Sequence, residues 1–175
     1  MVKRQVFFSF HYDNDSWRAA QVKNMGKVSE SSTFSANDWE EVKEKSDSKI
    51  EQWIDEQMAM RSCLIVLIGK KTANRKWINY EIKKAYQLDK GIVGIYINNL
   101  KNASAEQDSE GSNPFDYLTL SEDPLSKYVK CFKSNHSTSQ YVYSDIEDNI
   151  QNLIEYGIEH KPQFHIQLGS VYCLQ

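Results

Sequence analysis

The sequence predicts an α/β domain with a central parallel sheet and helices on both faces, and three observations support this class. Short apolar or β-branched segments alternate with amphipathic segments along the first hundred residues, which is the pattern of strands joined by crossover helices. The segments 62–69 and 91–97 are continuously apolar, as expected for strands that are covered on both faces. The 175 residues show no internal repeat and no second-domain boundary, so we expect a single domain over 1–175.

The N-terminal half supplies most of the expected sheet. Its predicted strands are rich in aromatic, aliphatic and β-branched residues, with the second one weak, and lie at 4–10, 29–35, 62–69 and 91–97. Its predicted helices carry apolar residues at helical spacing and lie at about 16–25, 38–60 and 74–90. Asp15 or Ser16 is the expected N-cap of the first helix, and Gly26 its end.

The pattern is looser after residue 98. A polar loop without periodicity is expected at about 99–113, and its composition is typical of a mobile segment. Two weaker strands are expected near 129–133 and 140–143. A C-terminal helix plus tail is expected at about 144–175, since isoleucines and leucines recur there on one helical side.

Composition argues against several classes of protein. The net charge of −3 comes without a basic stripe, so we expect no nucleic-acid partner. The apolar segments are too short to span a bilayer, and we expect no signal peptide, since the first residues lack its charge and cleavage-site pattern. Three widely spaced cysteines form neither a disulfide framework nor a metal knuckle, and the histidines lack ligand spacing. We therefore expect a cytoplasmic protein without a membrane or metal partner.

The position of a site follows from the expected topology. Ligands of open parallel sheets bind outside the carboxyl ends of the strands, where the strand order reverses. If the order is flavodoxin-like, 2-1-3-4-5, this crevice lies between the first and third predicted strands. The residues that this geometry brings together, as catalytic or substrate-binding candidates, are Ser9, Phe10, His11, Trp77 and Glu81.

One carboxylate beside an aromatic ring is sufficient for one kind of chemistry. Glycosidases generally need two carboxylates, because the leaving oxygen must be protonated. Nicotinamide leaves NAD as a neutral molecule and needs no acid, so a single carboxylate can stabilise the oxocarbenium-like transition state. On these residues alone, however, Glu81 also fits a solvated helix residue near Lys84, with Trp77 as a packing residue.

Several ordered motifs resemble one family. They are "VFFSFHYDND" at 6–15, W-E-x-x-K-x-x-S-D at 39–47, W-x-x-Y-E-I at 77–82 and "NPFDYL" at 113–118. Together they resemble the TIR-like proteins of the bacterial Thoeris anti-phage system, the ThsB type. The resemblance extends over most of the chain, although the "HYDND" loop does not align cleanly with the arginine-containing loop of plant and animal TIR domains.

The resemblance implies a flavodoxin-like TIR fold that uses NAD as a substrate rather than as a cofactor. It implies a cyclic ADP-ribose isomer as product, which acts as a second messenger for a separate NAD-depleting effector. A phage-derived trigger and self-association on activation are implied as well. Carried onto this chain, Glu81 is the catalytic carboxylate, Trp77 lies beside the nicotinamide, and Phe10 and His11 line the pocket. Trp39 is a further substrate-binding candidate.

Two other functions remain open at this point. A non-catalytic TIR module would bind further copies of the chain through the face around the second loop. A nucleoside deoxyribosyltransferase-like enzyme would use Glu81 to attack the sugar covalently. A phosphoacceptor receiver domain is not expected, because Gly69 and Lys70 rather than an aspartate follow the third predicted strand.

Overall fold

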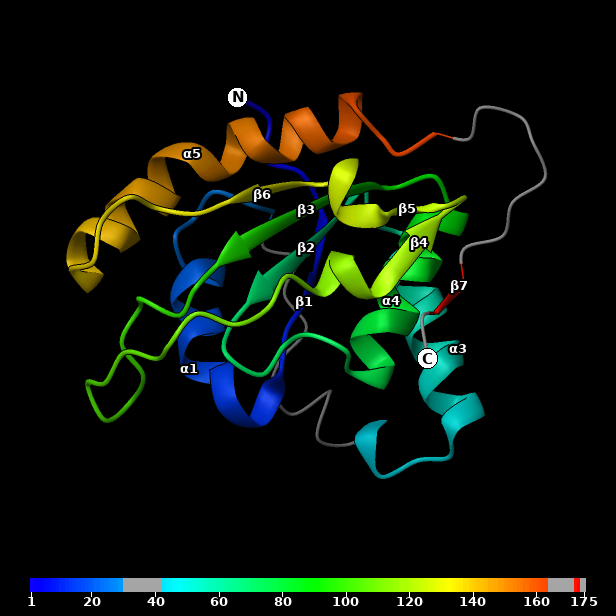
Figure 1. The fold of residues 1–175 in the computed structure, drawn as a ribbon, viewed down its shortest axis with the longest axis horizontal. Helices are drawn as coiled ribbons and strands as arrows, with labels where there is room; N and C mark the ends of the chain where they lie inside the picture. Colours follow the sequence, from blue (N-terminus) through cyan, green and yellow to red (C-terminus); the bar gives the residue numbers. More distant parts are fainter. Residues whose placement is uncertain (30–41, 164–171, 174–175) are drawn as a thin grey trace.

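A parallel sheet forms the centre of the molecule (Figure 1). The computed structural model describes residues 1–29, 42–163 and 172–173. In this part of the chain the parallel strands follow the order β1-β2-β3-β6, and they are β1 (Val6–Ser9), β2 (Cys63–Ile68), β3 (Gly91–Tyr96) and β6 (Lys130–Phe132). The register pairs Ser9 with Val66 and Val66 with Gly94. The first and third predicted strands are therefore neighbours, as the flavodoxin-like order requires.

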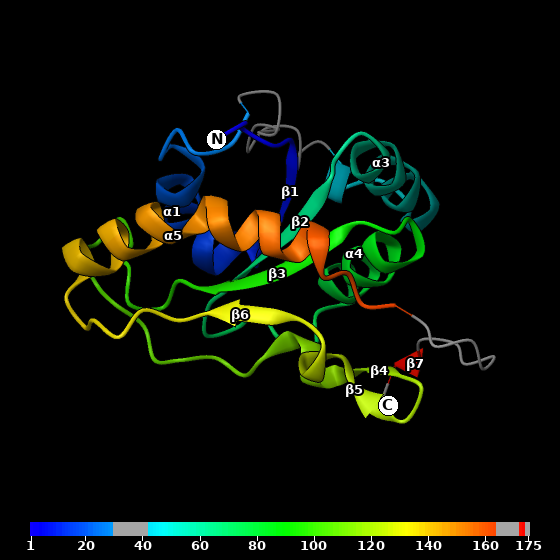
Figure 2. The same ribbon diagram turned by 90° about the horizontal axis from the view of Figure 1, so that it is seen from above.

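Helices cover both faces of this sheet, which confirms the predicted fold class (Figure 2). One face packs against α1 (Tyr12–Lys23) and α5 (Ser139–Glu159), and the other against α3 (Asp47–Ala59) and α4 (Lys76–Gln87). Side chains alternate between the faces along a strand. Phe8 accordingly packs with α1 and α5, whereas Phe7 packs with α3 and α4. Burial on both sides explains why the strands are continuously apolar.

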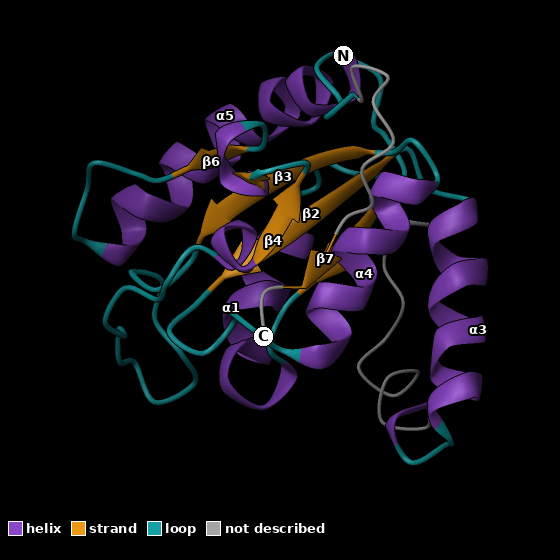
Figure 3. Cartoon of the chain, turned by 45° about the vertical axis from the view of Figure 1, so that its right-hand side comes forward, coloured by secondary structure: helices purple, strands orange, loops and turns teal. Residues whose placement is uncertain are grey.

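A small antiparallel sheet lies beside the α4 side of the molecule, and the sequence patterns did not predict it (Figure 3). Its strands follow the order β5-β4-β7 and are β4 (Leu118–Leu120), β5 (Asp123–Pro124) and β7 (Tyr172–Cys173). Two short 3₁₀ helices flank β4 and β5, namely η2 (Pro114–Tyr117) and η3 (Leu125–Lys127). The backbone of β7 pairs with β4, so a segment close to the C-terminus returns to the fold.

The predicted start of the first helix is wrong. Helix α1 begins at Tyr12, after an N-cap at His11 with φ −77° and ψ 104°. Asp15 and Ser16, the expected caps, lie inside the helix. Asp13 and Asp15 instead occupy its first turn, where negative charge interacts favourably with the helix dipole.

Predictions about two further segments differ from the structure. The strand near 140–143 is wrong, because α5 begins at Ser139 and not near 144. Val142, Ile146 and Ile150 share its buried face, and this helical periodicity overrides the local β propensity. The helix expected over 38–60 is interrupted in the described part of the chain: residues 42–43 are helical, 44–46 are not, and α3 begins at Asp47. The weak strand at 29–35 lies almost wholly outside the described residues.

Candidate active site

Glu81 lies on the buried face of α4. It shares that face with Ile78, Ile82 and Ala85, at the i, i+3, i+4 and i+7 spacing of a helix that packs on a sheet. Only 6% of Glu81 is exposed. The loop from Gly69 to Arg75 connects β2 to this helix, so the carboxylate is close to the carboxyl edge of the sheet.

Ser9 supplies the partner of this carboxylate. It is the last residue of β1 and is 1% exposed. Its hydroxyl donates a hydrogen bond to Oε2 of Glu81. Among the residues that the structure describes, this is the only hydrogen bond to the carboxylate, and Oε1 receives none. The structure thus brings together two candidates that stand 72 positions apart in the sequence.

Burial raises the pKa of Glu81 to about 8, and the Ser9 hydroxyl acts in the opposite direction because it stabilises the ionised form. A buried carboxylate without a cationic partner is costly to keep ionised. Such a group is therefore a candidate for function rather than for stability, since a bound cation would relieve that cost.

His11 lies at the start of α1, two residues after Ser9, and is half-buried. Its Nδ1 is buried and has no hydrogen-bond partner among the described residues. Burial lowers the pKa of His11, followed by the charge of Arg75, while Asp13 and Asp15 oppose this. The lowered pKa of His11 favours the neutral imidazole near pH 7.

The other predicted aromatic residues lie differently. Phe10 packs with the cluster of α1 and α5, and Lys23 Nζ lies 4.6 Å from the centre of its ring. Ser9 bonds to α4, so side-chain alternation sends Phe10 to the opposite face. The structure therefore does not bring Phe10 to Glu81.

Trp77 lies one turn before Glu81 on α4 and is half-buried against the cluster of α3 and α4. Its ring meets Tyr80 edge-on, with 6.1 Å between the ring centres, and Lys76 Nζ lies 4.5 Å from the Trp77 ring centre. Trp77 thus packs against the cluster of α3 and α4, and it also borders the helix face that carries Glu81. Trp39 lies outside the described residues.

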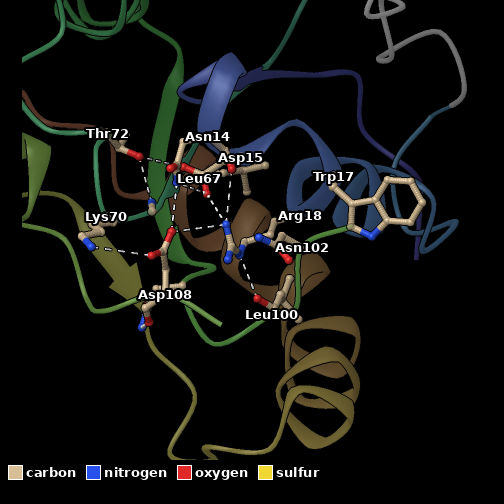
Figure 4. Close-up of polar contacts among 12 residues, drawn as sticks. Asn14, Asp15, Trp17, Arg18, Leu67, Lys70, Thr72, Leu100, Asn102 and Asp108 are labelled. Atoms are coloured by element: carbon tan, nitrogen blue, oxygen red, sulfur yellow. Dashed lines mark hydrogen bonds and ion pairs between the residues drawn. The ribbon is translucent and has the colours of Figure 1, made fainter. Parts of the chain in front are cut away.

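A second buried carboxylate, which sequence reasoning missed, lies at the same edge of the sheet (Figure 4). Asp15 is 0% exposed and accepts a hydrogen bond of 3.1 Å from Nη1 of Arg18, which is 1% exposed. The Arg18 guanidinium also donates to the backbone oxygens of Leu100 and Glu106, at 2.8 and 3.1 Å. Arg18 therefore connects α1 to the segment that was expected to be a mobile loop.

Asp108 completes this cluster. Its carboxylate lies 3.5 Å from Nη1 of Arg18 and accepts a hydrogen bond of 3.1 Å from Asn14. Gln21 donates to the backbone oxygen of Lys101 at 2.8 Å. The polar loop is thus tied to α1 at several points, and composition alone did not predict this.

Two glycines allow the loops at this edge to pack closely. A Cβ on Gly69 would lie 2.2 Å from Oδ2 of Asp15, and a Cβ on Gly111 would lie 2.1 Å from the backbone oxygen of Gly69. Both distances are far below a van der Waals contact. The turn after β2 is therefore enclosed by the Asp15 carboxylate on one side and by the polar loop on the other.

Residues 1–29, 42–163 and 172–173 contain no group of three or more metal-ligating side chains. Among the helices of these residues, none has the length and apolar character that a membrane crossing requires.

The parallel sheet, with a buried carboxylate on the helix after β2 and a serine at the end of β1, is consistent with the architecture of a TIR-like domain. Residues 7–102, more than half of the chain, match the family described as "Thoeris protein ThsB, TIR-like domain". The chain belongs to this family. The matched residues include Ser9, His11, Trp77 and Glu81.

A relative from Bacillus cereus (strain MSX-D12) is 42% identical over 123 residues and is named "Putative cyclic ADP-D-ribose synthase ThsB1". The alignment covers 67% of this chain and 64% of the relative. The chain therefore matches less than two thirds of that protein's own length.

Proposed function

We propose that this chain cleaves NAD at the nicotinamide–ribose bond and closes the remaining ADP-ribose into a cyclic isomer. One observation carries the proposal: Glu81 is a buried carboxylate at the carboxyl edge of the sheet, and its hydrogen-bond partner is an uncharged hydroxyl. The membership in the ThsB family and the name of the Bacillus cereus relative support the same activity.

The reaction proceeds through charge that the buried carboxylate can stabilise. The bond between ribose C1′ and the pyridinium nitrogen breaks, its electron pair returns to the ring, and neutral nicotinamide leaves. The positive charge moves to the ribose, where ionised Glu81 stabilises it in a medium of low dielectric constant. A nucleophilic atom of the same ADP-ribose then attacks C1′ and loses its proton, which closes the ring. Attack by water instead would give linear ADP-ribose.

The buried position of Glu81 favours this use of a carboxylate. The substrate is itself a cation, so binding would place the positive charge of the pyridinium, and then of the ribose, next to Glu81, which has no cationic partner among the described residues. The apolar neighbours Ile78 and Ile82 keep the local dielectric constant low. Trp77 offers an aromatic surface one turn away for the nicotinamide ring.

The wider role forms part of the same proposal. The cyclic product would act as a second messenger for a separate effector protein, and a phage-derived signal would start its synthesis by inducing self-association. We place the reaction in the cytoplasm, since Cys63 and Cys131 are free thiols, as is typical of a reducing compartment.

The test is to incubate the purified chain with NAD, alone and under conditions that promote assembly, and to identify products by mass spectrometry. We expect free nicotinamide and a cyclic ADP-ribose isomer. Glu81→Gln, which keeps the shape of the side chain, should lower nicotinamide release at least about 100-fold. Its unfolding transition should show that the variant still folds.

Three outcomes would contradict the proposal. Normal turnover by Glu81→Gln would remove Glu81 from the mechanism. Assembly of the chain without NAD consumption would favour a non-catalytic interaction module. A glycosyl adduct on Glu81 that forms with a nucleoside but not with NAD would favour a deoxyribosyltransferase-like enzyme.

A further inference from the structure

We propose that Ser9 is a positioning residue, which holds the Glu81 carboxylate in its reactive orientation through a hydrogen bond and does not itself bind NAD. This inference rests on the proposed function. It changes the role expected for Ser9, which the fold geometry had nominated as a substrate contact.

The location of Ser9 leaves its hydroxyl little freedom. The residue ends β1, pairs with Val66 of β2 in the parallel ladder, and is 1% exposed. A hydroxyl has one proton to donate, and this one is directed to Oε2 of Glu81. A second donation to a substrate is therefore excluded while the bond to Glu81 persists.

The bond selects one carboxylate oxygen and leaves the other for the substrate. Oε2 is held by a residue of the rigid sheet, whereas Oε1 has no hydrogen bond among the described residues. A glutamate side chain has three rotatable bonds, so fixing one oxygen removes most of its conformational freedom before the substrate arrives. The strand thereby preorganises a side chain that belongs to a helix.

Charged groups on the surrounding elements do not replace Ser9 in this role. On α4, Lys84 pairs with Asp55 of α3, and Lys76 pairs with Asp47 of α3. Lys71 and Arg75, in the segment between β2 and α4, and Asp13 and Asp15, in the first turn of α1, exert their charge effects on His11. In the described part of the chain, burial raises the pKa of Glu81 and the hydrogen bond from Ser9 lowers it, so none of these charged groups takes the place of Ser9.

The test compares Ser9→Ala with Ser9→Thr, which removes and keeps the hydroxyl respectively. We expect Ser9→Ala to lower kcat about 10-fold or more with KM for NAD changed less than about twofold. The acid limb of its pH–rate profile should move upward by about one pH unit, because the ionised form of Glu81 loses its hydrogen bond. Ser9→Thr should restore both properties.

Two results would overturn the role of Ser9. A raised KM with unchanged kcat would make Ser9 a substrate contact. A lowered kcat with an unmoved acid limb, in a variant that folds normally, would reduce Ser9 to a packing residue.

A readout without NAD separates this inference from the proposed function. Carbon-13 NMR of labelled glutamate follows the titration of Glu81 directly, with Glu81→Gln identifying its signal. We expect the titration midpoint to rise in Ser9→Ala and to return in Ser9→Thr. An unchanged midpoint in Ser9→Ala would overturn the hydrogen-bonding role, even if the wild-type chain consumes NAD. An inactive wild-type chain would contradict the proposed function alone.

Discussion

Asp15 and Glu81 are both buried carboxylates at the carboxyl edge of one sheet, yet their surroundings differ. Asp15 lies 3.1 Å from Arg18 and receives a further hydrogen bond from Asn14. From the described residues Glu81 receives a single hydrogen bond, which Ser9 donates. Burial raises the pKa of both groups, but among the residues that the structure describes only Asp15 has a cation beside it.

This difference separates a structural carboxylate from one that is available for chemistry. The charge of Asp15 is already compensated by Arg18, which also holds the polar loop. The charge of Glu81 is not compensated by any cation among the described residues. A positively charged substrate would supply that compensation, which is the property that cleavage of a pyridinium–ribose bond needs.

The largest expected effect on stability comes from removing the cation of Asp15. Arg18→Met leaves Asp15 buried without its partner and removes the donors to Leu100 and Glu106. We expect the free energy of unfolding to fall by about 3–5 kcal/mol, measured by urea denaturation. Lys3→Met, an exposed cation at the N-terminus, is the control and should change it by less than about 0.5 kcal/mol. Equal stability of the two variants would show that the Arg18 cluster is not a structural anchor.

A smaller effect on stability is expected at Glu81, where removing the ionisable group should stabilise the fold at high pH. Its folded pKa of about 8 exceeds its ordinary value of 4.5, so the fold favours the protonated form. The contribution of protonated Glu81 to the free energy of unfolding is fully present below pH 4.5 and is lost as the pH rises through about 8. Relative to Glu81→Gln, the wild-type chain should therefore lose about 2–4 kcal/mol of stability between pH 5 and pH 8. Urea denaturation at both pH values tests this, and parallel pH dependence of the two chains would contradict it.

The smallest expected effect concerns the contact between Asp15 and the turn after β2. A methyl group at Gly69 would overlap the Asp15 carboxylate, so Gly69→Ala should cost about 1–3 kcal/mol. Thermal unfolding measures the loss. In an Asp15→Ala background the same substitution should cost less, because the overlapping atoms are gone. If Gly69→Ala destabilised both backgrounds equally, the loss of stability would not come from overlap with the Asp15 carboxylate.

The location of Glu81 near the end of β1 could be predicted from helical spacing and from the topology of parallel sheets. Helical spacing placed it on the apolar face of one helix, and parallel topology placed that helix next to the end of β1. The bond between Ser9 and Glu81 was not predicted as such, although the two residues were expected to be neighbours. Phe10 was grouped with them incorrectly, since strand alternation sends it to the opposite face from Ser9.

The Asp15–Arg18 cluster could not be predicted in the same way. An aspartate and an arginine three positions apart on a helix usually form an exposed pair. Their burial depends on the loop that follows β3. Arg18 donates hydrogen bonds to the backbone oxygens of Leu100 and Glu106 in this loop, which hold it against α1. The composition of that loop carries no information about its path.

The most direct test of the central claim measures two properties on two matched variants, Glu81→Gln and Asp15→Asn. Nicotinamide release from NAD and the unfolding midpoint are determined for each, with activity expressed per folded molecule. We expect Glu81→Gln to lose at least about 100-fold in activity without loss of stability, and Asp15→Asn to lose stability while its activity stays within a few-fold of wild type. Wild-type nicotinamide release by Glu81→Gln would contradict the account.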